Sequence, residues 1–159
     1  MLNSANNEIL TRVGPGTAMG GLFRQFWQPA LLCEELPAPD CPPVRVRLMG
    51  ENFVAFRDSS GKVGLLDAHC PHRLAELFFG RNEEGGLRCV YHGWKFSVTG
   101  ELLDMPSEPA GSPMRCNPNI RAKAYSVHEA GGIVWAYLGP QECVPPLPQM
   151  EFMSLPAQN

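Results

Sequence analysis

The sequence predicts a mainly β protein: an antiparallel β-sandwich base with a short N-terminal helix and a small inserted β lobe. The chain has 159 residues, enough for one ordinary domain with a hydrophobic core. Its 16 prolines and 16 glycines interrupt it at short intervals, which favours short strands and loops over long helices. Runs of β-branched and aromatic residues lie between these breaks, as expected for strands joined by turns.

The N-terminal part holds the clearest helical pattern, over residues 16–27. Thr17 is of a helix-capping type, and the apolar side chains after it recur at the spacing of one helical face: Met19, Leu22, Phe23 and Phe26. We expect this face to pack against the rest of the domain, and a contact with another subunit is the alternative.

Strand patterns follow the helix. Residues 44–48 alternate between apolar and arginine side chains, which is typical of a half-buried strand. The expected strands are 44–49, 52–57, 63–67, 87–90, 95–98, 122–129 and 132–138. Residues 68–100 then form a lobe inserted between strands of the base, in which Lys95 and residues 81–84 should be solvated.

The C-terminal part differs in composition from the rest. Residues 103–119 are rich in proline, serine and glutamate and should form a loop. Pro145, Pro146 and Pro148 favour an extended, polyproline-like segment. We therefore expect one domain over residues 1–140 and a proline-rich linker and tail over 141–159.

Composition limits the partners of the chain. The formal net charge is −3 and no basic run occurs, which argues against nucleic acid as a partner. No apolar stretch approaches the roughly twenty residues that a membrane span needs. Residues 1–8 lack the pattern of a secretory signal. We expect a cytoplasmic protein with no membrane contact, whose cysteines stay reduced.

Two short pairs of ligand-type residues carry the chemistry. One residue separates Cys70 from His72, two separate Cys89 from His92, and sixteen lie between the pairs. A [2Fe–2S] centre of the Rieske kind binds one iron through two cysteine thiolates and the other through two histidine nitrogens. Each pair would give one ligand to each iron. The pattern therefore predicts that Cys70, His72, Cys89 and His92 bind such a cluster.

Two other interpretations of these residues stay open. Two Cys and two His also make a structural zinc site, although zinc fingers usually pair Cys with Cys and His with His. Here each pair is mixed, and the second pair leads into a strand-like run, 95–98, rather than a helix. The four residues could otherwise be ordinary core residues, but their order in two tight pairs argues against a chance match.

Around these pairs the sequence resembles a known family. Residues 70–73 and 89–96 are similar to the Rieske domain of aromatic-ring-hydroxylating oxygenase large (alpha) subunits. Residues 10–20, 27–30 and 104–109 resemble its phthalate-dioxygenase-like branch. The resemblance implies a Rieske-type fold, in which the inserted lobe binds the cluster.

The resemblance also implies roles for residues next to the ligands. Backbone amides of the two ligand loops should donate to the cluster sulfurs, aromatic side chains should shield the cluster, and a third loop at 104–107 should cover it. The alternatives are ordinary packing for the aromatic residues, a solvated side chain for the arginine and a plain surface loop for 104–107. The residues expected in these roles are Arg73, Tyr91, Gly93, Trp94, Met105 and Pro106.

The residues near the ligands also indicate the kind of Rieske centre. High-potential Rieske proteins carry an additional cysteine in each loop and a serine after the second His-Gly, where this chain has Ala75, Tyr91 and Trp94. Fewer donors stabilise the reduced, more negative state less. We expect a reduction potential on the order of −150 mV. The family commonly has glycine where this chain has Leu74, so the first-loop backbone should differ there.

Oxygenases of this family also bind a mononuclear iron through two histidines and a carboxylate, in a second, larger domain. Apart from the two ligand-pair histidines, the chain has only His69 and His128, and Glu129 adjoins His128. These residues do not make a credible oxygen-activating site, so the chain should be the redox part of an oxidoreductase.

By resemblance, the chain would transfer single electrons from an NAD(P)H-dependent reductase or ferredoxin. The acceptor would be the mononuclear Fe(II) of a catalytic domain, in the same or a neighbouring subunit of a homotrimer. A freestanding Rieske ferredoxin and a zinc-stabilised binding module are the alternatives.

Overall fold

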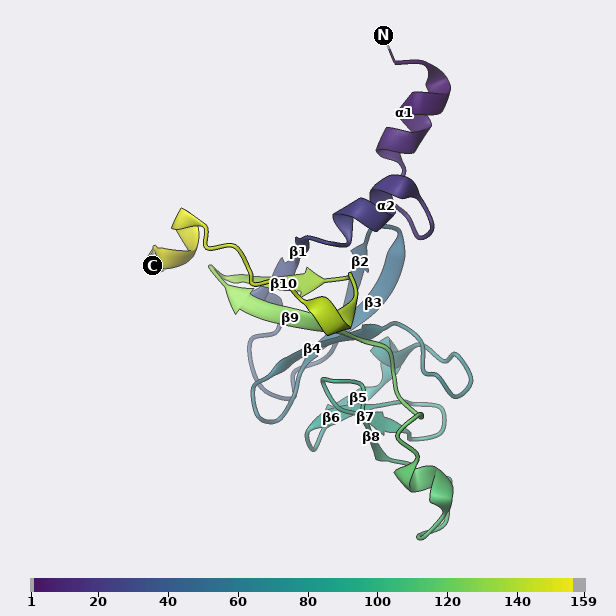
Figure 1. Cartoon of the computed structure of the whole chain (residues 1–159). Helices are drawn as coiled ribbons and strands as arrows, with labels where there is room; N and C mark the ends of the chain where they lie inside the picture. The colour runs from purple at the N-terminus through teal and green to yellow at the C-terminus, as the bar shows by residue number, and fades with distance from the viewer. Residues whose placement is uncertain (1, 156–159) are drawn as a thin grey trace.

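The computed structural model describes residues 2–155 and shows two antiparallel sheets below two short N-terminal helices (Figure 1). A six-stranded base sheet has the order β1-β10-β9-β4-β3-β2, and a four-stranded lobe sheet has the order β5-β6-β7-β8. The predicted mainly β fold is thus confirmed. The base strands are β1 (Trp27–Leu32), β2 (Val44–Leu48), β3 (Glu51–Arg57), β4 (Val63–Asp67), β9 (Ala124–Ala130) and β10 (Ile133–Tyr137). The lobe strands are β5 (Arg81–Glu83), β6 (Gly86–Arg88), β7 (Lys95–Phe96) and β8 (Leu102–Asp104).

Strand β3 separates two hydrophobic cores. Phe53 and Ala55 point into the core of the base, whereas Val54 and Phe56 point into a second core between base and lobe. Successive side chains of a strand point to opposite faces, so covering both faces of β3 buries all four residues. The second core reaches into the lobe and also contains the two candidate ligands Cys70 and Cys89.

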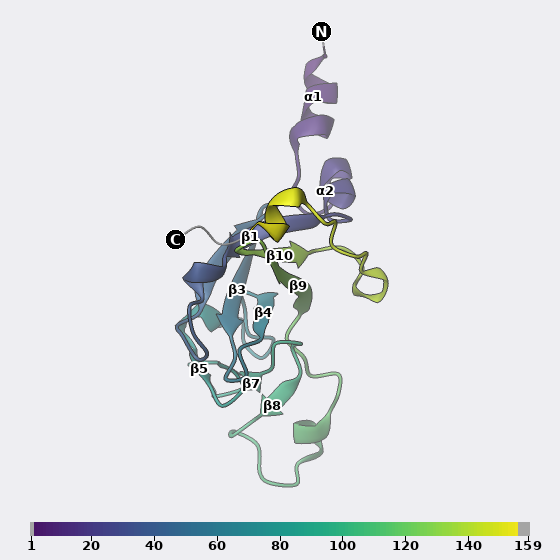
Figure 2. The ribbon, with the colours of Figure 1, turned by 90° about the vertical axis from the view of Figure 1, so that its left-hand side faces the viewer.

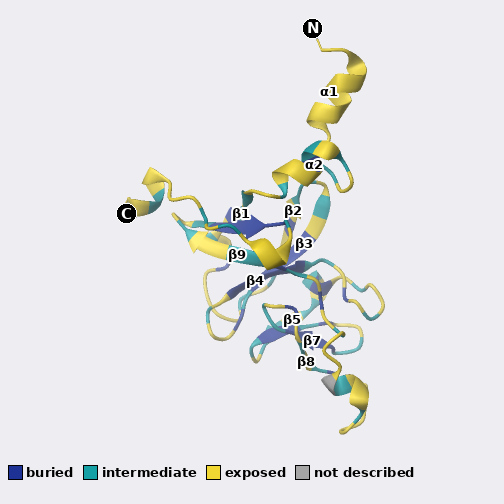
Figure 3. Cartoon of the chain, viewed as in Figure 1, coloured by how far each residue is buried: buried dark blue, intermediate teal, exposed yellow. Residues whose placement is uncertain are grey.

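The N-terminal helices differ from the prediction. Helix α2 (Ala18–Phe23) is capped as expected, because the Thr17 hydroxyl accepts a hydrogen bond from the Gly20 amide at 3.1 Å, but it ends four residues before position 27. Of the predicted apolar face, Leu22, Phe23 and Phe26 are exposed and only Met19 is half-buried, so the predicted packing of this face against the domain is wrong. The unpredicted helix α1 (Ser4–Thr11) continues away from the sheets, and both helices are mostly exposed (Figures 2 and 3).

Two further corrections concern strands. Strand β1 was not predicted, because Pro29 interrupts it; it lies at the edge of the base sheet, where a missing amide is tolerated, and its register shifts at Pro29. Residues 81–84, expected as a solvated turn, begin the β5–β6 hairpin, whose turn residues Glu84 and Gly85 have φ of 50° and 79°. Lys95 is buried rather than solvated, and its Nζ donates to Glu84 Oε2 at 3.0 Å.

The remaining segments are irregular or form short 3-10 turns. Strand β8 begins at Leu102, so the expected loop at 103–119 starts with a strand and contains the 3-10 turn η3 (Pro113–Cys116). Residues 144–150 have no regular structure, as the prolines predicted, and Trp27 Nε1 donates to the Pro145 carbonyl at 2.9 Å. The other turns are η1 (Cys33–Glu35), η2 (Leu77–Phe79), η4 (Gln141–Cys143) and η5 (Glu151–Ser154). Among the described residues, no helix is long and apolar enough to cross a membrane.

Candidate metal centre

The two ligand loops have the same backbone construction. In the first, the Cys70 amide donates to the Ala75 carbonyl and the Leu74 amide donates to the Cys70 carbonyl, both at 2.9 Å. In the second, the Cys89 amide donates to the Trp94 carbonyl at 2.8 Å and the Gly93 amide to the Cys89 carbonyl at 3.1 Å. In each loop, backbone hydrogen bonds therefore join the cysteine to the residues four and five positions after it.

Both loops need a left-handed residue at the closing position. Gly93 has φ of 75°, and Leu74 has φ of 56°. Glycine adopts this conformation freely, whereas a leucine does so at a cost of about 1–2 kcal/mol. Leu74, where the family commonly has glycine, takes up the conformation that glycine favours, so the expected difference in the first-loop backbone is not found. Its side chain is 72% exposed.

The loops bring the two cysteines together inside the second core. Cys70 and Cys89 are 2% and 3% exposed, and neither forms a disulfide. Burial raises the pKa of the Cys70 thiol to about 11, and the adjacent Cys89 adds to the shift, while backbone amides of His72 and Arg73 that donate to the sulfur oppose it. The thiol therefore keeps its proton at neutral pH unless a metal displaces it.

The two histidines also lie next to each other. The ring centroids of His72 and His92 are 4.6 Å apart, and His72 Nδ1 is buried without a hydrogen-bond partner. Burial, His92 and Arg73 together lower the pKa of His72, which favours the neutral imidazole that binds metals. A buried ring nitrogen without a hydrogen-bond partner fits the role of a metal ligand.

The four side chains form two pairs, thiol beside thiol and imidazole beside imidazole. Within the described part of the chain, no three Cys, His, Asp or Glu side chains converge on a point where they could hold a single ion. A Rieske cluster requires this arrangement in pairs, because each of its two irons takes two ligands of one kind. The donor set therefore fits a [2Fe–2S] cluster.

Trp94 and the third loop cover the pairs. The Trp94 ring stacks on His72 with centroids 4.4 Å apart and planes within 4°, and its Nε1 donates to Ser107 Oγ at 3.3 Å. Met105 is fully buried in the same core as Cys70 and Cys89. The structure thus brings these residues of the predicted third loop to the ligand loops.

The outer edge of the site is exposed. Tyr91 contacts His92 with centroids 3.9 Å apart and is itself 58% exposed, so it shields only one side of that imidazole. Arg73 and Val90 are also exposed, and both histidines are half-buried. The thiols therefore face the protein interior and the imidazoles face its surface.

One residue that sequence reasoning missed is Arg88. It ends β6 immediately before Cys89, and its guanidinium donates to the Gly93 carbonyl and to Asp104, both at 2.8 Å. An arginine beside a cysteine gives no signal in the sequence, because its partners lie five and sixteen residues away.

The other two histidines, His69 and His128, have different neighbours. The Glu129 carboxylate, which adjoins His128, is held by Arg57 through hydrogen bonds of 2.5 and 3.1 Å. His69 Nδ1 lies 3.7 Å from Asp67 Oδ1.

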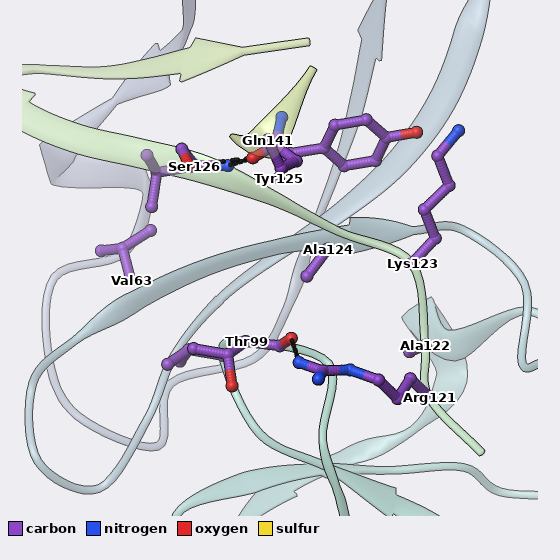
Figure 4. A pocket seen from close by; sticks show the side chains of 11 residues that line it. Val63, Thr99, Arg121, Ala122, Lys123, Ala124, Tyr125, Ser126 and Gln141 are labelled. Atoms are coloured by element: carbon purple, nitrogen blue, oxygen red, sulfur yellow. Dashed lines mark hydrogen bonds between the residues drawn. The ribbon is translucent and has the colours of Figure 1, made fainter. Parts of the chain in front are cut away.

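A groove of 580 Å³ runs along β9 on the base (Figure 4). Its lining includes the apolar residues Val63, Val98, Ala124 and Val127, and at one side the Ser126 amide donates to Gln141 Oε1 at 2.8 Å. None of its lining residues is a candidate ligand, so the groove is separate from the metal centre.

Comparison with known proteins adds to this geometry. The profile of the Rieske [2Fe–2S] domain matches residues 26–126. The chain is 51% identical over 156 residues to the oxygenase subunit of 3-chlorobenzoate-3,4-dioxygenase from Comamonas testosteroni, covering 98% of this chain and 35% of that protein. It is 50% identical over 145 residues to the oxygenase subunit of phthalate 4,5-dioxygenase from Pseudomonas putida, covering 91% and 33%.

A solved structure shares the fold. The structure of an oxygenase and ferredoxin complex of carbazole 1,9a-dioxygenase superposes with a TM-score of 0.68 at 28% identity, covering 87% of this chain and 33% of that one. The chain spans about a third of the length of the relatives that it matches.

Proposed function

This chain belongs to the Rieske [2Fe–2S] domain family, in the group of phthalate-dioxygenase-like oxygenase subunits, and we propose that it delivers single electrons to the mononuclear iron of an aromatic-ring-hydroxylating oxygenase. The proposal rests on one observation: two buried thiols lie next to each other, and two half-buried imidazoles lie next to each other beside them.

Four side chains would hold the cluster. Cys70 and Cys89 would bind one iron as thiolates, and His72 and His92 would bind the other through ring nitrogens. When bound, the cluster supplies a one-electron redox couple. The chain itself contributes the amides that face the Cys70 sulfur, the stacking of Trp94 on His72 and the exclusion of water by Met105.

Electrons would enter and leave at the imidazole edge. The side chains around that edge are exposed and mostly apolar, with one positive charge: Leu74, Val90, Tyr91 and Arg73. We propose an NAD(P)H-dependent reductase or a ferredoxin as the electron donor, which agrees with the ferredoxin complex formed by the carbazole oxygenase. The acceptor would be a catalytic domain of the same or a neighbouring subunit, in a homotrimer.

The placement of the chain in the whole protein follows from the same resemblance. Residues 1–140 would be the Rieske domain, and residues 141–159 would lead toward the catalytic domain, which binds the mononuclear Fe(II). The proposed location is the cytoplasm, where ferredoxins and reductases supply electrons.

Analysis of the purified protein for iron, acid-labile sulfide and zinc tests the proposal. We expect about two irons and two sulfides per chain, a red-brown colour and a rhombic EPR signal after reduction. A colourless protein that holds about one zinc would contradict the proposal and support the zinc-stabilised module. A freestanding ferredoxin would give the same spectra, and the reading frame beyond Asn159 would distinguish it.

A further inference from the structure

We propose that Arg88 is a positioning residue for the cluster, because its guanidinium ties the second ligand loop to the third loop. This inference rests on the cluster binding proposed above. The side chain of Arg88 hydrogen-bonds to residues other than the four ligands, and it would act through the backbone of Gly93 and the carboxylate of Asp104.

The first contact closes the second ligand loop. Arg88 precedes Cys89, and Nη1 of Arg88 donates to the carbonyl of Gly93 at 2.8 Å. The guanidinium thus spans the neck of the loop, from the residue before the cysteine to the residue after His92. Because Gly93 directly follows His92, fixing its carbonyl restricts the peptide that carries this imidazole.

The second contact reaches the third loop. The same Nη1 donates to Oδ2 of Asp104 at 2.8 Å, and Oδ1 of Asp104 accepts a hydrogen bond from Arg115 at 3.0 Å. Arg115 also donates to the carbonyls of Met105 and Glu108, at 3.2 and 2.9 Å. A chain of charges therefore runs from the second ligand loop to the backbone on both sides of Pro106.

Acidic and basic side chains alternate along this path. Arg88 and Arg115 face Asp104, and Nε of Arg88 donates to Glu83 at 2.6 Å. The Arg88 side chain is 14% exposed and Asp104 is 29% exposed, so removing one partner would leave the others poorly solvated. A planar guanidinium spreads its N–H donors over three nitrogens and so reaches a carbonyl and two carboxylates in different directions, whereas a lysine carries all its donors on one nitrogen.

The second ligand loop and the third loop are in direct contact beside Arg88. Gly93 lies so close to Pro106 that an added Cβ would be 2.7 Å from the Pro106 ring. The third loop thus covers the second ligand loop without a gap. If Arg88 were lost, the third loop would be free to separate from the second ligand loop, and water would enter between Gly93 and Pro106.

Substitution of Arg88 tests the proposal on the cluster-loaded protein. In Arg88→Gln we expect shifted or broadened g-values of the reduced protein, and cluster bleaching in air about tenfold faster than in the wild type, a factor equivalent to about 1.4 kcal/mol. Arg88→Lys keeps the positive charge but not the planar guanidinium, so it should show the same changes to a smaller extent.

Arg81→Gln is the matched control. Arg81 pairs with Arg88 across the β5–β6 hairpin and also binds Glu83, but it contacts neither Gly93 nor Asp104. It should therefore behave like the wild type. If Arg88→Gln does not fold, Asp104→Asn is the second variant. It removes the negative charge between Arg88 and Arg115 with little change in side-chain shape, and it should also shift the g-values.

The outcomes separate the two proposals. Wild-type g-values and bleaching rates in Arg88→Gln, or in Asp104→Asn where that variant replaces it, would overturn the positioning role. The same would follow if the Arg81→Gln control changed as much as these variants. A wild-type protein that holds no iron would instead overturn the proposed function.

Discussion

Replacing Gly93 with alanine should damage the second ligand loop more than the same replacement at Gly85. Both glycines have left-handed backbones, with φ of 75° and 79°. A Cβ on Gly93 would lie 2.7 Å from Cγ of Pro106, whereas a Cβ on Gly85 would meet nothing within 4 Å. The pair therefore separates backbone strain from the contact between the second ligand loop and the third loop.

The two effects have different sizes. A non-glycine residue in the left-handed region costs about 1–2 kcal/mol, and this cost applies to both variants. Forcing an additional atom into a packed contact typically adds about 1–3 kcal/mol, and this applies only beside Pro106. Gly85→Ala should therefore lower the free energy of unfolding by about 1–2 kcal/mol, and Gly93→Ala by about 2–5 kcal/mol.

Thermal unfolding of the cluster-loaded proteins measures the difference. For a domain of this size, 1 kcal/mol shifts the midpoint by roughly 2–4 °C, so the variants should differ by several degrees at equal scan rate and cluster content. Gly93→Ala should also alter the EPR spectrum, because Gly93 adjoins His92. Equal midpoints and unchanged spectra in both variants would refute the close packing of Pro106 on the ligand loop.

Three further predictions concern the core, the base and the cluster. Met105→Ala should cost about 2–5 kcal/mol, because Met105 is fully buried, whereas the 44%-exposed Met114→Ala should cost under about 0.5 kcal/mol in the same urea titration. A hydrogen bond from Arg57 lowers the pKa of Glu129, so its stabilising effect is complete above the ordinary glutamate value of about 4.3 and is lost as the pH falls through the lower folded-state value. The wild type should therefore exceed Glu129→Gln in unfolding midpoint near pH 7, and a gap that widens on acidification would contradict this. The midpoint potential should be on the order of −150 mV, and a strongly positive value in a redox titration would rule out the low-potential type.

The sequence was sufficient to predict the elements whose pattern is local. Strand β4 was predicted at its observed bounds, and β2 and β3 within one residue, because their apolar runs end at glycine or serine turns. The ligand pairs could be found for the same reason, since each lies within a few residues. The pairing of thiol with thiol and imidazole with imidazole then followed from the loops.

What the sequence did not show depends on partners far along the chain. Strand β1 contains Pro29 and is stabilised by β10, more than a hundred residues later in the chain. Lys95 was expected in water, but Glu84 in the neighbouring hairpin neutralises it where it is buried. The role of Arg88 likewise depends on Asp104, which local patterns place in a loop.

The division into two cores explains how the ligand loops are held. The core of the base contains neither Cys70 nor Cys89. The second core contains both, and Val54, Phe56 and Leu66 of the base sheet pack into it. The thiol side of the site is therefore fixed by apolar packing on the base sheet. The imidazole side has no such support, because it faces the surface. There the imidazoles are restrained by individual contacts: Trp94 stacks on His72, and a hydrogen bond from Arg88 fixes the peptide that follows His92. An electron-transfer site needs one edge open to its partners, and these contacts hold that edge in place without burying it.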